Sequence, residues 1–119
     1  MPNFDPETLR LLDSADEVDI ETSRGRRTIW IVVDGQTAYI RSVRGTAGAW
    51  YRAVQRDPQA QLHVDRRSLS IRLAPVDDPS AVARVSAAID HKYRSRWPGP
   101  TDSMLRPEVL GTTLRVDPA

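Results

Sequence analysis

The chain of 119 residues contains no cysteine. This absence excludes disulfides, a cysteine nucleophile, a CxxC redox pair and thiolate metal ligands. Long hydrophobic runs are also missing, because the longest, Ile29 to Val33, is strand-sized and far below the roughly 18 apolar residues of a membrane helix. The acidic N-terminus does not resemble a secretory signal. With 39% hydrophobic and 28% charged residues, the sequence predicts one soluble, cytoplasmic globular domain over residues 1–119.

Residues that support metal or nucleophilic chemistry are scarce. His63 and His91 are the only histidines, and neither stands in a metal-ligand pattern. No G-x-S-x-G elbow, P-loop or dinucleotide fingerprint occurs. The sequence therefore predicts no metal site, gives little support to a hydrolase and leaves any catalytic residue unknown. Whatever reaction occurs would need a bound cofactor.

Charge is segregated along the chain although the net charge is only +1. Residues 1–23 carry seven acids against one arginine, whereas residues 24–72 carry ten arginines against three acids. The basic middle favours an anionic ligand or a nucleic acid. The alternative is that the acidic start folds against it, or that the charges are spread over a solvated surface. An aromatic content of 6% argues against nucleic acid binding.

Hydrophobic periodicity predicts an α+β domain. Val18 to Ser23 alternates like a half-buried strand, and the unbroken apolar run at Ile29 predicts a central strand covered on both faces. Asp34-Gly35 predicts a tight hairpin turn, Asp5 can cap a first helix, and Trp97 to Pro100 stops a long one. The predicted helices are 6–14, 49–56 and 79–96, and the predicted strands are 18–23, 29–33, 37–42, 61–65, 68–74 and 109–116.

Six strands joined mainly by tight turns predict a small, mainly antiparallel barrel, since closure removes exposed sheet edges. The barrel would comprise about 16–75 and 109–116, with flanking helices.

A loop with features of an anion site follows the third predicted strand. It contains arginines, hydroxyls and glycines and leads into the helix at Ala49, whose N-terminus favours negative charge. The Asp34-Gly35 hairpin would place residues 27–29 beside residues 40–42. An ordinary connecting loop remains the alternative. The residues expected to converge are Arg27, Thr28, Arg41, Ser42 and Arg44.

Five segments in order resemble the split β-barrel superfamily of pyridoxamine-phosphate-oxidase-like flavin proteins, nearest to small relatives of the deazaflavin-dependent nitroreductases. The likeness spans roughly residues 16–75. The segments that carry it are Ile20-Glu21-Thr22, Gly25 to Gly35, Ala38 to Gly45, Trp50-Tyr51 and Asp57 to Leu62.

The resemblance implies a six-stranded split barrel, usually a homodimer, with FMN or an 8-hydroxy-5-deazaflavin coenzyme at the interface. It implies a hydride-transferring oxidoreductase acting on a small-molecule acceptor. The C-terminal tyrosines of the nitroreductases are reduced here to Tyr93, which supports the alternative of a non-catalytic ligand-binding split barrel. The residues expected at the cofactor are Arg27, Thr28, Ile29, Trp30, Arg41, Ser42, Val43, Arg44, Gly45, Trp50 and Tyr51.

Overall fold

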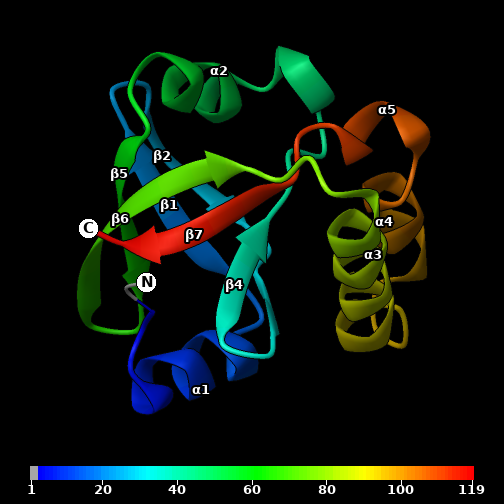
Figure 1. Cartoon of the computed structure of the whole chain (residues 1–119), viewed down its shortest axis with the longest axis horizontal. Coiled ribbons are helices and arrows are strands. Elements are labelled where there is room, and N and C mark those ends of the chain that lie inside the picture. Colours follow the sequence, from blue (N-terminus) through cyan, green and yellow to red (C-terminus); the bar gives the residue numbers. More distant parts are fainter. Residues whose placement is uncertain (1–2) are drawn as a thin grey trace.

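One antiparallel sheet, curled into a half-barrel, dominates the computed structural model, which describes residues 3–119 (Figure 1). The strand order across the sheet is β2-β1-β5-β6-β7-β4-β3. The α+β split-barrel prediction is confirmed, with seven strands rather than six. The strands are β1 (Val18–Thr22), β2 (Gly25–Ile29), β3 (Val32–Asp34), β4 (Thr37–Ile40), β5 (Gln59–Val64), β6 (Arg67–Pro75) and β7 (Leu114–Pro118).

The additional strand arises where the apolar run of residues 29–33 divides. Ile29 ends β2 and Val32 begins β3, and these two strands form opposite edges of the sheet. The prediction of one central strand was therefore wrong. Since the sheet curls, its edges approach each other, and the chain passes between them at Trp30 and Ile31. Burial alone explains the apolar run, because residues at a bend inside the molecule need the same side chains as a buried strand.

Helices cover the ends and one side of the curled sheet (Figure 1). α1 and α2 lie at opposite ends of the half-barrel, while α3, α4 and α5 lie together beside β4. The predictions of helices at 6–14 and 49–56 are confirmed. The helices are α1 (Pro6–Ser14), the 3-10 turn η1 (Gly45–Ala47), α2 (Ala49–Arg56), α3 (Pro79–Tyr93), α4 (Pro98–Met104) and α5 (Pro107–Leu110).

Prolines in the C-terminal third begin helices as well as ending them. α3 stops at Tyr93 rather than at residue 96, and Pro98 then starts α4. Proline fits the first helical turn because its fixed φ is helical and no N–H partner is needed there. The predicted strand 109–116 was wrong in its first half, because Val109 and Leu110 belong to α5 and β7 begins only at Leu114.

Two turns show how local chemistry sets the hairpins. The predicted hairpin joins β3 to β4, but its two turn residues are Gly35, at φ +64°, and Gln36, because Asp34 still pairs with Thr37. The turn between β5 and β6 has no glycine, and Asp65 takes the left-handed conformation there at φ +52°. Aspartate tolerates this region better than most residues because its short polar side chain can bond locally. Asp5 precedes α1 but caps no backbone N–H, and its carboxylate instead accepts from the Thr8 hydroxyl.

Two apolar clusters hold the layers together. The larger fills the curled sheet, and Ala38 and Ile40 of β4 point into it. The intervening Tyr39 points to the other face, where it packs with Val85, Tyr93 and Met104 of the helical layer. This period of two puts apolar side chains on both faces of β4. Each fully buried side chain contributes roughly 1.5–3 kcal/mol, so the helical layer is an integral part of the domain.

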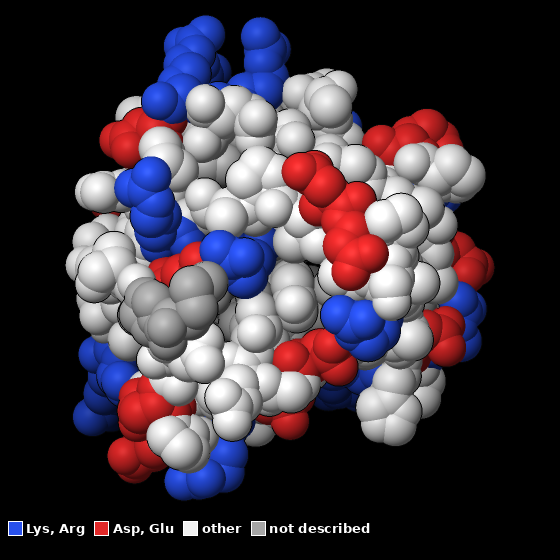
Figure 2. Space-filling model, viewed as in Figure 1, with Lys and Arg blue, Asp and Glu red and all other residues white. Residues whose placement is uncertain are grey.

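Charged side chains are interspersed on the face shown in Figure 2. Two acids of the N-terminal segment are paired with arginine, Asp19 with Arg26 at 3.1 Å and Asp16 with Arg96 at 2.6 Å. These contacts fit the interpretation that the charges pair or spread over the surface. In residues 3–119 no helix has the length and hydrophobicity needed to cross a membrane.

Candidate functional site

A cavity of about 610 Å³ lies between the end of β2 and the loop that follows β4. The β3–β4 hairpin pairs Val32 with Tyr39, so the segments before and after it diverge from neighbouring points. α2 and α4 complete the walls. The lining residues are Glu17, Arg27, Thr28, Ile29, Trp30, Arg41, Ser42, Val43, Arg44, Gly48, Ala49, Trp50, Trp97, Pro100 and Met104.

Arg27 and Arg44 supply unpaired positive charge at this cavity. Both are exposed, and neither forms an ion pair with any residue between 3 and 119. Arg27 Nη1 donates to the carbonyl of Arg26 at 2.9 Å, and its other guanidinium donors have no partner among residues 3–119. Guanidinium groups bind phosphate and carboxylate well because their donors form a planar fork.

Arg41 is different because its side chain is only 1% exposed. Its guanidinium donates to Thr113 Oγ1 at 2.9 Å and to Ser86 Oγ at 3.0 Å. It also donates to the carbonyls of Met104 at 3.0 Å and Val82 at 3.2 Å. Burial lowers the pKa of Arg41 to about 10, and the group stays charged at neutral pH. Arg41 therefore ties the end of β4 to α3 and α4.

Ser42 shapes the loop from within. Its amide donates to Thr112 Oγ1 at 3.0 Å, and its hydroxyl donates to the Gly45 carbonyl at 2.8 Å. The Ser42 hydroxyl is thus committed to the loop. A Cβ on Gly48 would lie 2.5 Å from Ser42 Oγ, so only glycine fits beside this hydroxyl.

Free backbone donors remain in the same loop. Within residues 3–119 the amides of Val43 and Arg44 donate no hydrogen bond. Successive free amides next to positive side chains form a concave anion-binding arrangement. The loop therefore offers two amides and the Arg44 guanidinium to an anion.

All three tryptophans of the chain line the cavity, and Trp30 and Trp97 lie together as an aromatic wall. Trp30 stacks on Tyr93 with ring centroids 3.9 Å apart and planes 8° apart. Trp97 lies 6.0 Å from Trp30 in a tilted arrangement, with Arg96 over its ring at 4.5 Å. This rigid wall suits a planar ring.

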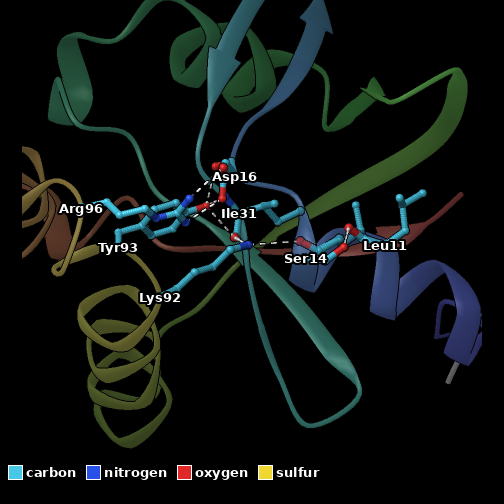
Figure 3. Close-up of polar contacts among 8 residues, drawn as sticks. Leu11, Ser14, Asp16, Ile31, Lys92, Tyr93 and Arg96 are labelled. Carbon is cyan, nitrogen blue, oxygen red and sulfur yellow. Dashed lines mark hydrogen bonds and ion pairs between the residues drawn. The ribbon is translucent and has the colours of Figure 1, made fainter.

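Side chains from the end of α3 hold the bend beside this wall (Figure 3). The Ile31 amide donates to the Tyr93 hydroxyl at 3.3 Å, and that hydroxyl lies 2.9 Å from the Asp16 carbonyl. Lys92 Nζ donates to the carbonyls of Ile31 at 2.7 Å and Leu12 at 3.2 Å. These side chains satisfy the Ile31 backbone in place of a neighbouring strand, which is why the ladder can break there.

Burial shifts the pKa of both side chains. Desolvation lowers the pKa of Lys92 to about 8 and raises the pKa of Tyr93 to about 12. Tyr93 is therefore neutral near pH 7 and acts as a fixed hydrogen-bond group. Asp16, which Arg96 contacts, has its pKa lowered by that hydrogen bond.

The structure brings together most of the residues that the sequence singled out. Gly45 and Tyr51 do not line the cavity, whereas the other predicted residues do. Gly45 sits behind the loop at φ +63°, and Tyr51 packs edge-on against Trp50 at 6.2 Å. That these residues bind a cofactor stays a prediction.

Sequence reasoning missed Glu17, Pro100 and Met104, and left Trp97 open between a lid and a packing role. Pro98 after Trp97 was the available signal, because proline often begins a helix and so predicts a second wall there. The position of Glu17 at the cavity depends on strand pairing, because the β1–β2 register places the neighbouring Val18 opposite Ile29, which also lines the cavity.

The histidines lie elsewhere. His63 is on the outer face of β5, where Nε2 lies 2.7 Å from Glu21 Oε1 and Nδ1 lies 2.9 Å from Ser68 Oγ. The described part of the chain contains no group of three or more possible metal ligands.

Solved structures with similar folds include three whose described ligands differ. The heme storage protein HutZ from Vibrio cholerae is 11% identical over 98% of this chain and 91% of that chain, with a TM-score of 0.68. A FAD-binding protein from Mesorhizobium loti is 11% identical over 98% and 91%, with a TM-score of 0.62. An F420-H2 dependent reductase is 12% identical over 86% and 94%, with a TM-score of 0.59. At these identities the likeness shows the split-barrel fold alone.

Among curated proteins none matches this sequence. A family model described as "Uncharacterized protein conserved in bacteria (DUF2255)" matches residues 8–116, which is most of the chain. The chain therefore belongs to the DUF2255 family, built on the split β-barrel fold.

Proposed function

We propose that this chain binds a phosphate-bearing flavin-type cofactor, FMN or an 8-hydroxy-5-deazaflavin coenzyme, and acts as a reductase that passes hydride to a small-molecule acceptor. The observation that carries the proposal is the pairing, in one cavity, of unpaired arginines with an aromatic wall. Arg27 and Arg44 suit the phosphate, and Trp30 and Trp97 suit the ring. The similar folds of a FAD-binding protein and an F420-H2 dependent reductase support it.

The residues present fit such a group in size and chemistry. A volume of about 610 Å³ lies within the roughly 300–1,000 Å³ usual for small-ligand pockets. Arg44 and the amides of Val43 and Arg44 would hold the phosphate. The β2 residues Thr28 and Ile29 border the cavity beside Trp30 and would position the ring edge. When bound, the ring supplies the hydride chemistry that the side chains lack.

A haem ligand is not favoured by the same cavity. Neither His63 nor His91 is among its lining residues, so the usual imidazole ligand to haem iron is missing there. Among residues 3–119, Met104 is the only sulfur-bearing residue in the lining. The unpaired arginines and the aromatic wall together fit a phosphate-bearing ring better.

The alternative is a split barrel that binds the same ligand without turnover. The observation in its favour is that, within residues 3–119, the cavity lining contains a single carboxylate, Glu17, and no histidine. Oxidation of the reduced, bound cofactor by added quinone or nitroaromatic acceptors separates the two. Acceptor-dependent oxidation above the rate of free cofactor supports the reductase, and its absence leaves the binding protein.

The direct test is titration of the purified protein with FMN and with the deazaflavin coenzyme in parallel, followed by tryptophan quenching. We expect one ligand to bind, and Arg44→Ala to weaken it by about tenfold or more, as for loss of a charged hydrogen bond. Arg52→Ala on the exposed face of α2 is the matched control and should bind normally. Equal affinity in Arg44→Ala would remove Arg44 from the site, and no binding of either ligand would refute the proposal.

We also propose a homodimer, as the resemblance implies. β2 leaves one edge of the sheet unpaired beside the cavity, with Val43 exposed nearby. A second copy placed there would enclose the ligand. Light scattering coupled to size exclusion should give twice the chain mass of 13.4 kDa, and a monomer at all concentrations would contradict this.

A further inference from the structure

Arg41 is the only fully buried charged side chain in residues 3–119. The groups that accept its hydrogen bonds, two hydroxyls and two carbonyls, are all uncharged. A buried cation without a counter-charge is costly, by several kcal/mol in an apolar surrounding. Within residues 3–119 the positive charge of Arg41 is therefore not balanced by a negatively charged hydrogen-bond partner.

The cavity is where a negative charge can be supplied, because Arg41 is one of its lining residues. The charged lining residues are Arg27, Arg41 and Arg44 against the single acid Glu17. Three positive charges and one negative charge leave a net charge of +2. A guanidinium carries five N–H groups, and the four hydrogen bonds of Arg41 leave one of them, on Nη2, without a partner among residues 3–119.

We propose that the cavity takes a dianion, such as a phosphate monoester or inorganic phosphate, as the counter-charge of Arg41, and that its binding strengthens the attachment of α3 and α4 to the sheet. The inference deepens the proposed function and rests on it only for the use of this cavity. Binding of the dianion does not require that the ligand carry a flavin or deazaflavin ring. A phosphate monoester is close to dianionic at neutral pH, since its second pKa is about 6.

The link to the helices follows from what Arg41 contacts. One guanidinium joins Val82 and Ser86 of α3 to the Met104 carbonyl at the end of α4. Its fourth contact, Thr113, precedes β7. An anion beside Arg41 lowers the cost of keeping the guanidinium buried, so every contact that it makes becomes harder to break. Ligand binding would then be felt in the helical layer as well as in the loop.

The experiment compares inorganic phosphate with chloride at matched ionic strength and pH 7.5. Urea unfolding and amide hydrogen exchange are the readouts, with sulfate as a second dianion and nitrate as a monoanion. We expect the two dianions to raise the unfolding midpoint, nitrate to have little effect, and exchange in α3 and α4 to slow. Arg41→Lys should weaken phosphate binding by about tenfold, because it loses a charged donor fork. Arg72→Lys, an exposed arginine of β6, is the control.

The outcomes separate this inference from the proposed function. If phosphate stabilises the protein while FMN binds no tighter than phosphate, the ring proposal fails and this inference stands. If riboflavin binds as tightly as FMN and phosphate has no effect, this inference is overturned while a ring site remains. If Arg41→Lys fails to fold, amide hydrogen exchange of the wild type tests the proposal instead. Exchange rates in α3 and α4 that do not change when phosphate is added would overturn it.

Discussion

The indole of Trp30 lies flat on the phenol ring of Tyr93, with centroids 3.9 Å apart. Sixty-three positions separate the two residues, and they have different roles. Trp30 lines the cavity, while the Tyr93 hydroxyl holds the backbone of Ile31 next to it. The stack therefore connects the bend between β2 and β3 to the end of α3, and so fixes the aromatic wall in place.

Removing the Tyr93 hydroxyl should destabilise the bend. Tyr93→Phe keeps the stacked ring but leaves the buried Ile31 amide without its acceptor. We expect a loss of about 1–3 kcal/mol in unfolding free energy, measured by urea denaturation. Tyr51→Phe is the control, because the Tyr51 ring is half-buried and should lose less than about 0.5 kcal/mol. A Tyr93→Phe protein as stable as the wild type would show that the hydroxyl does not hold the bend.

Lys92 should make stability rise with pH. Its pKa is about 8 in the folded protein and near 10.5 when unfolded, so above pH 8 the unfolded chain binds more protons. The sign of the linkage then requires the free energy of unfolding to increase between pH 8 and 10. A neutral amine still has two N–H groups for the Ile31 and Leu12 carbonyls. The raised pKa of Tyr93 acts in the opposite direction only above its ordinary value of 10.0.

The measurement compares the wild type with Lys92→Met at pH 7.5 and 9.5. The wild type should gain about 1 kcal/mol relative to the variant, a value reduced for the partial exposure of the amine. Because Lys92 is the only lysine among the 17 basic Lys and Arg residues, carbon-13 lysine labelling gives one side-chain signal that titrates directly. A midpoint near 10.5 would contradict the lowered pKa.

Gly48 should not accept a side chain. Gly48→Ala places a Cβ 2.5 Å from Ser42 Oγ, and that hydroxyl cannot turn away without losing the Gly45 carbonyl. We expect a loss of about 1–3 kcal/mol, as for overpacking of a buried contact. Gly111→Ala meets no atom within 4 Å and should be neutral or slightly stabilising. Thermal unfolding of both variants distinguishes a close contact from a general intolerance of alanine.

Trp97 should contribute to ring binding and not to phosphate binding. Trp97→Ala removes a half-buried wall of the cavity and leaves Arg44 untouched. We expect FMN affinity to fall by about tenfold, which is the range of one ring-stacking contact. The affinity for inorganic phosphate should stay the same. Parallel titrations measure both, and an equal loss for the two ligands would mean that the variant disturbs the whole cavity.

Local sequence determines much of this molecule. Several features depend only on neighbouring residues and could therefore be predicted from the sequence. They are the hairpin at Asp34-Gly35, the alternation along β1, the amphipathic α3 and the helices that begin at proline. The sequence also predicts an anion site in the loop from Arg41 to Arg44, since its residue types and the following helix are contiguous, and the structure places this loop on the cavity. Its convergence with Arg27 and Thr28 could be inferred from the hairpin alone.

Tertiary structure decided the rest, because it depends on partners distant in the chain. The apolar run at residues 29–33 looks like one strand, yet Tyr93 and Lys92 satisfy Ile31 and allow the run to divide between two sheet edges. Arg41 and Arg44 are the same residue type three positions apart. Only the packing of α3 and α4 buries the first among neutral acceptors and leaves the second exposed at the cavity, since burial is a property of the whole fold.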